Sequence, residues 1–193
     1  MDTEVSCIIN IFTIIDSKIN LLVKNDNSII NIECLDDLDS VCMKYINENL
    51  KIEDLKLDQY YTFSDKQENL KLSILYIGII NKDSISLNNS FKFIELNNLN
   101  CNNKYIYKSI EYLKKNLVLS NVIKKVFSNL FILPELQKTY ENLFNIKYDR
   151  RNFRKRLVKL DIIEDSNTYS DGKNGRPAKL YKFKNIEDNI MII

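Results

Sequence analysis

The arginines of this 193-residue chain are concentrated in one short segment. All five, Arg150, Arg151, Arg154, Arg156 and Arg176, fall within 27 residues, and lysine supplies the basic charge everywhere else. The guanidinium group is a planar fork of hydrogen-bond donors that fits a phosphate group and the N7 and O6 edge of guanine. The concentration therefore predicts contact with a nucleic acid. The alternative is a solvated basic surface.

Four of these arginines lie in "DRRNFRKRLVKL", residues 149–160, which reads as a helix with Asp149 as its N-cap. At about 100° per residue, Phe153, Leu157 and Leu160 share the side that faces the core. The opposite side and the flanks are basic or amide-bearing, and arginine and asparagine can pair with guanine and adenine edges. We expect this helix to read DNA bases rather than merely solvate a surface. Its predicted DNA-binding residues are Arg150, Arg151, Asn152, Arg154, Lys155 and Lys159.

A second basic segment is "SDGKNGRPAKLYKF", residues 170–183, which holds two of the chain's three glycines and one of its two prolines. Glycine gives the backbone freedom in φ and proline fixes it, so the segment is typical of a sharp turn between two strands. A turn tip that carries a guanidinium can enter the minor groove or clamp a phosphate. We predict DNA contact by Lys173, Asn174 and Arg176. The alternative is an ordinary hairpin loop.

The elements around these residues have the order of a winged helix-turn-helix. "PELQKTYENLF", residues 134–144, opens with proline at the first position of a helix, and four residues separate it from the arginine-rich helix. "DIIED" (161–165) and "KLYKF" (179–183) are then two strands joined by the glycine-containing loop. Upstream, helical periodicity predicts a helix over about 104–117 and a second over 119–128.

The first half of the chain has a different pattern. Apolar runs predict strands over 5–15, 19–23, 55–63, 70–80 and 91–96, and the run at 70–80 is too continuously apolar for a sheet edge. A helical spacing of apolar residues, with aspartates at its first turn, lies within "LDDLDSVCMKYINENL". The predicted fold class is α+β, with a mixed sheet and helices in the first half and the winged helix-turn-helix in the second.

Charge divides the chain at the same place. Residues 1–100 carry 9 basic and 16 acidic side chains, a net charge of −7, and residues 101–193 carry 19 and 10, a net charge of +9. A reversal of this size indicates that the halves meet different partners, the second of them polyanionic. We therefore predict two domains, over residues 1–102 and 103–193.

The remaining composition argues against several classes of protein and site. Hydrophobic content of 45% with 28% charged residues is typical of a folded soluble protein without a membrane span. The N-terminus lacks the basic start of a secretory signal. The four cysteines form no CxxC pair and the chain has no histidine, so we expect free thiols in a reducing cytoplasm and no Cys/His zinc site. No metal and no cofactor are predicted.

The segments "ELQKTYENLF", "DRRNFRKRLVKLDIIED" and "GKNGRPAKLYKF" resemble, in order and spacing, the C-terminal winged helix of the Nudix-related transcriptional regulators. "LDQYYTFSD" followed by "LSILYIGII" is similar to the N-terminal Nudix-like domain of that family. The resemblance implies a sequence-specific DNA-binding regulator, most simply a repressor, that acts as a homodimer on double-stranded DNA. It also implies that residues 1–102 sense a small-molecule effector such as ADP-ribose or a sugar.

The matching helix departs from the box of working Nudix hydrolases, Gly-x5-Glu-x7-Arg-Glu-x-x-Glu-Glu-x-Gly. In "KYINENLKI", Lys44, Tyr45, Asn49 and Lys51 replace the arginine, two of the glutamates and the glycine, which leaves Glu48 alone. One carboxylate cannot build a Mg²⁺ site. We therefore predict no catalytic residues and no enzyme. The alternative function is a Nudix-type nucleoside-diphosphate hydrolase with an accessory basic domain, and a winged helix that binds RNA or protein also stays open.

Overall fold

The computed structural model describes residues 3–52, 55–66, 69–99, 103–119, 124, 127, 129–171 and 176–184. The chain divides into two compact units, which are described separately. Unit 1 comprises residues 1–13 and 20–112, and unit 2 comprises residues 14–19 and 113–193. No helix among the described residues is long and apolar enough to span a membrane.

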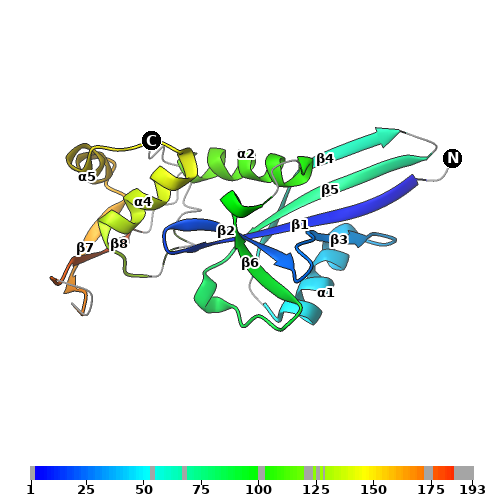
Figure 1. Cartoon of the computed structure of the whole chain (residues 1–193), viewed down its shortest axis with the longest axis horizontal. Coiled ribbons are helices and arrows are strands. Elements are labelled where there is room, and N and C mark those ends of the chain that lie inside the picture. Colours follow the sequence, from blue (N-terminus) through cyan, green and yellow to red (C-terminus); the bar gives the residue numbers. More distant parts are fainter. Residues whose placement is uncertain are drawn as a thin grey trace. The chain divides into compact units, whose positions relative to one another are not determined.

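Unit 1 is built on a mixed six-stranded sheet in the order β4-β5-β1-β2-β6, with β3 also paired to β1 (Figure 1). Long-range parallel pairing joins β1 and β5 in register from Thr3 opposite Leu70 to Phe12 opposite Ile79. The other described pairings of β3, β4 and β6 are antiparallel. The strands are β1 (Thr3–Ile15), β2 (Lys18–Lys24), β3 (Ile30–Glu33), β4 (Leu57–Lys66), β5 (Leu70–Ile79) and β6 (Phe91–Glu95).

Helix α1 (Leu38–Leu50) covers one face of this sheet. Asp37 caps it by accepting a 2.9 Å hydrogen bond from the backbone N–H of Ser40, as an aspartate at an N-cap does. Its buried Cys42 and Ile46 join the odd-numbered residues of β1 in one apolar core. Because successive side chains of a strand point to opposite faces, the even-numbered residues of β1 face the other way.

Helix α2 (Lys104–Leu119) packs on that second face through its first turns. Buried Asn10 of β1 donates a 2.6 Å hydrogen bond from Nδ2 to Oγ of Ser109, which also bonds the hydroxyl of Tyr60. Ser109 thus gives the buried Asn10 Nδ2 a hydrogen-bond partner, whereas Asn10 Oδ1 has none among the described residues. Short 3-10 turns at Lys82–Ser84 and Leu96–Asn98 flank β6.

Unit 2 contains α4 (Leu133–Phe144), α5 (Arg150–Lys159) and a two-stranded sheet of β7 (Ile163–Tyr169) and β8 (Lys179–Phe183) (Figure 1). Phe131 forms a β-bridge with Tyr181, and its ring packs at a tilt of 33° against that of Phe183 with centroids 4.5 Å apart. The β1–β2 turn belongs to this unit, and Asn142 of α4 donates a 2.7 Å hydrogen bond to the carbonyl of Ser17.

The predicted α+β class, with a mixed sheet followed by a winged helix-turn-helix, is confirmed. Strand β3 was not predicted, and β7 begins two residues later and runs four residues further than "DIIED". Most of the helix predicted over 119–128, and the cysteine at position 101, lie outside the described residues. Among the described residues, Cys7, Cys34 and Cys42 are free and buried.

Candidate nucleic-acid interface

Helix α5 is held against α4 by an aromatic core. Phe153 and Leu157 are buried on one side of α5. The ring of Phe153 lies 6.0 Å from that of Tyr140 on α4 and 5.5 Å from that of Tyr148 in the connecting turn. These are favourable spacings for aromatic pairs. Since only this narrow side is buried, the rest of α5 is available to a partner.

The turn between the two helices is fixed by a carboxylate. Helix α4 ends at Phe144, and its C-cap residue Asn145 adopts a left-handed conformation with φ 53°. Glu141 Oε1 accepts hydrogen bonds from Gln137 Nε2 at 2.9 Å and from the backbone N–H of Tyr148 at 3.0 Å. Gln137 Nε2 also donates to the Tyr148 carbonyl at 3.0 Å. The Gln137 bond, followed by the Tyr148 bond, lowers the pKa of Glu141 below its usual value of 4.5.

The outward face of α5 is basic and exposed. Asp149 caps the helix as predicted, because its Oδ1 accepts a 2.9 Å hydrogen bond from the Asn152 backbone N–H. The Asn152 carboxamide makes no hydrogen bond to another described residue, so it can face a partner. The sequence-predicted residues of this helix that the structure places in exposed positions are Arg150, Arg151, Asn152, Arg154, Lys155 and Lys159. Contact of each with DNA stays a prediction.

Two features of the helix-turn-helix, one on α5 and one on α4, were missed from the sequence. Val158 is 58% exposed between the basic positions, and an apolar side chain on a base-reading face suits the methyl group of thymine. Glu141 was missed as the residue that holds the turn. Its signal was the i, i+4 spacing to Gln137, a spacing at which helical side chains interact.

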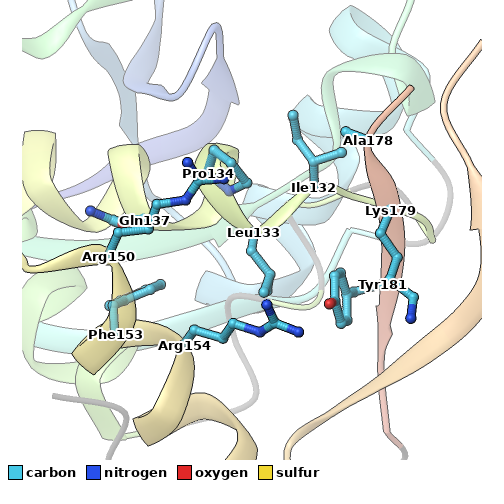
Figure 2. Close-up of a pocket in the computed structure, with 10 residues that line it drawn as sticks. All are labelled: Ile132, Leu133, Pro134, Gln137, Arg150, Phe153, Arg154, Ala178, Lys179 and Tyr181. Atoms are coloured by element: carbon cyan, nitrogen blue, oxygen red, sulfur yellow. The ribbon is translucent and has the colours of Figure 1, made fainter. Parts of the chain in front are cut away.

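A pocket of about 200 Å³ opens on one flank of α5, between this helix, the start of α4 and β8 (Figure 2). Figure 2 shows the Arg154 side chain extending from α5 toward Tyr181 on β8. The polar lining residues are Arg150, Arg154, Gln137 and Lys179, and the apolar ones are Ile132, Leu133, Pro134, Phe153, Ala178 and Tyr181.

Of the predicted DNA-binding residues of the wing, the structure describes Arg176. Arg176 is exposed just before β8. Lys173 and Asn174, predicted at the wing tip, lie outside the described residues. The short wing sheet itself is antiparallel, with Ile163 opposite Phe183 and Glu164 opposite Lys182.

The lysines of the wing differ from the arginines in that they form ion pairs. The lysines on and after β8 each bond a carboxylate: Lys179 with Asp165, Lys182 with Glu164 at 2.8 Å and Lys184 with Asp161 at 2.6 Å. By contrast, within the described ranges Arg150, Arg151, Arg154 and Arg176 have no ion pair and no side-chain hydrogen bond. Their charge is therefore available to an external anion.

The described acidic residues near α1 in unit 1 form no comparable site. Asp37 caps the helix, Asp39 accepts a 2.7 Å hydrogen bond from the Tyr76 hydroxyl, and Glu48 is exposed. Burial and then the Asp39 bond raise the pKa of Tyr76. Among the described residues, no group of three or more histidine, cysteine, aspartate or glutamate side chains could hold a metal ion.

One known family matches the C-terminal part of the chain. Residues 124–183 match the family described as the NrtR DNA-binding winged helix domain. No curated protein matches the chain in sequence. The predicted resemblance to the Nudix-related transcriptional regulators is thus confirmed for the winged helix domain.

Solved structures extend the likeness to the whole chain. NrtR of Shewanella oneidensis, crystallised in complex with a 27mer DNA, is 19% identical, with a TM-score of 0.73 over 96% of this chain and 99% of that one. A MutT/nudix family protein from Enterococcus faecalis is 11% identical, with a TM-score of 0.66 over 95% of this chain and 87% of that one. At these identities the likeness shows the fold, which is that of a Nudix-like domain joined to a winged helix.

Proposed function

We propose that this chain, which has the fold of NrtR and an NrtR-type winged helix domain, is a sequence-specific DNA-binding transcriptional regulator. The observation that carries the proposal is a set of exposed arginines that have no ion pair or side-chain hydrogen bond to another described residue: Arg150, Arg151, Arg154 and Arg176. Their guanidinium groups are donors suited to phosphate and guanine. Supporting it, the solved relative with this fold was crystallised with a 27mer DNA.

The proposal assigns DNA binding to residues 103–193 and effector sensing to residues 1–102. It places the protein in the cytoplasm, as a homodimer that acts most simply as a repressor. The effector is a small molecule of the nucleotide-sugar or sugar class, such as ADP-ribose. The sequence of α1 supports a sensing rather than a catalytic role. Lys44, Tyr45 and Asn49 stand in place of the Nudix arginine and two of its glutamates, and Glu48 is the one glutamate kept.

The experiment is a titration of salt against binding to a long mixed-sequence duplex. A protein that neutralises about six phosphates gives a slope of log K against log[salt] of about −5. We expect a steep negative slope of that order. A flat dependence, or no binding at low salt, would reject DNA as the partner and favour the protein-binding alternative. An RNA duplex of the same length, measured in parallel, tests the RNA alternative.

A further inference from the structure

We infer that the pocket beside α5 binds one sugar-phosphate unit of the DNA backbone, with Arg150 and Arg154 as its phosphate ligands, so that α5 reads bases with its outer face only. This inference rests on the proposed function. It divides the predicted DNA-binding residues of α5 into those that bind the DNA backbone and those that contact bases.

The charge distribution around the pocket identifies the ligands. Arg150 and Arg154 are one turn apart on α5 and have no ion pair within the described ranges. Lys179 also lines the pocket, but its charge is compensated by Asp165, and the amide of Gln137 is already bonded to Glu141 and Tyr148. Two guanidinium groups are thus the uncompensated positive groups of this lining, and a phosphodiester is the anion that a DNA-binding surface meets.

The start of α4 lines the pocket without adding free positive charge. Pro134 has no backbone N–H, the Glu135 N–H donates to the Ile132 carbonyl at 3.1 Å, and Glu135 places a carboxylate in the first turn. The two arginines therefore define the site.

The size and walls of the pocket fit a backbone unit better than a free ligand. At about 200 Å³ it is smaller than the roughly 300–1,000 Å³ typical of small-molecule sites. Its walls include the side chains of Leu133, Phe153 and Tyr181, which suit the apolar faces of a deoxyribose. The lining thus combines guanidinium groups for a phosphate with apolar side chains for a sugar.

Helical geometry separates the pocket residues from the outer face. At about 100° per residue, Arg151 and Lys155 point away from the buried side of Phe153 and Leu157, whereas Arg150 and Arg154 lie on one flank. From this flank the Arg154 side chain extends into the pocket toward β8 (Figure 2). Base contacts specify sequence and phosphate contacts fix the position of the protein.

The test compares Arg154→Gln with Arg151→Gln in the full-length protein. Both changes remove one unpaired guanidinium from the same helix, so they are matched in chemistry and exposure. We expect Arg154→Gln to weaken binding to every duplex by the same factor, about 3- to 10-fold near 0.1 M salt, and to make the salt slope shallower by about 0.9. We expect Arg151→Gln to change the preference at a base position. Far-UV circular dichroism and a melting curve establish that both variants fold.

Single methylphosphonate substitutions along the bound duplex identify the phosphate. Wild type should lose affinity when one particular phosphate is neutralised, Arg154→Gln should be insensitive at that phosphate, and Arg151→Gln should keep the full loss. A wild type that binds no duplex would reject the proposed function itself. If wild type binds but Arg154→Gln alters base preference, or retains the wild-type affinity and slope, the assignment of the pocket is wrong.

Discussion

We predict that Glu141 contributes more than any other side chain to the stability of the turn between α4 and α5. It accepts two hydrogen bonds, from Gln137 Nε2 at 2.9 Å and from the Tyr148 backbone N–H at 3.0 Å. Its ion pair with Lys147 is 3.3 Å long, and the lysine side chain is 88% exposed. Substitution of Glu141 by alanine removes all three interactions and leaves the apolar packing between α4 and α5 in place.

The magnitude follows from the two hydrogen bonds. A bond to a charged group contributes about 1.5–3 kcal/mol net, whereas an exposed ion pair contributes about 0–1 kcal/mol. Tyr148 is only partly buried, so we expect water to replace part of what the variant loses and the two bonds not to add in full. We expect Glu141→Ala to lower the free energy of unfolding by about 2–3 kcal/mol. Glu141→Gln keeps an oxygen acceptor and should cost about 1 kcal/mol.

The assay is urea denaturation followed by far-UV circular dichroism, because the chain contains no tryptophan for fluorescence. Lys147→Ala is the control and should change stability by less than about 0.5 kcal/mol. The Glu141→Ala variant should bind all DNA sequences more weakly to the same extent, because α5 keeps its side chains but its orientation relative to α4 is no longer fixed by the turn. A Glu141→Ala protein as stable as wild type, or a Lys147→Ala protein equally destabilised, would refute this role of the carboxylate.

Three further outcomes are expected. Because the pKa of Glu141 is lowered in the folded state, its stabilisation is present above about pH 4.5 and is lost as pH falls through the lowered value. The stability difference between wild type and Glu141→Gln, measured by denaturation at several pH values, should therefore shrink below pH 4.5. The Lys182→Ala variant loses an exposed ion pair with Glu164 and should change DNA affinity less than Arg154→Gln does, by fluorescence anisotropy; an equal loss would contradict the distinction between paired and unpaired cations. Incubation of the protein with ADP-ribose and Mg²⁺ should give no turnover, by chromatography of the products, and enzyme-like rates would establish the hydrolase alternative.

Local patterns made much of the fold predictable from the sequence. The helix after Asp149 was predictable because its N-cap residue and its apolar spacing both lie within the twelve residues 149–160. Strand β3 was missed because it has only four residues, too few for a periodicity to stand out. The parallel pairing of β1 with β5 joins residues about 67 positions apart, such as Thr3 and Leu70, and no local pattern encodes it.

The candidate site was predictable in its residue types but not in its arrangement. The pocket gathers side chains from 132–137, 150–154 and 178–181, so it exists only after α4, α5 and β8 have packed together. In the sequence alone, the lysines of the wing and the arginines are equivalent positive charges. Only the structure shows that Lys182 and Lys184 have carboxylate partners while Arg151 and Arg154 have none among the described residues.

The central claim is that the outer face of α5 reads a DNA sequence. Selection of bound duplexes from a randomised library, carried out in parallel with wild type and with an Arg151→Ala, Asn152→Ala double variant, tests it most directly. We predict that wild type enriches a defined motif and that the variant loses preference at base positions within it, at about 1–3 kcal/mol per contact. No enrichment by wild type, or the same motif from both proteins, would contradict the claim.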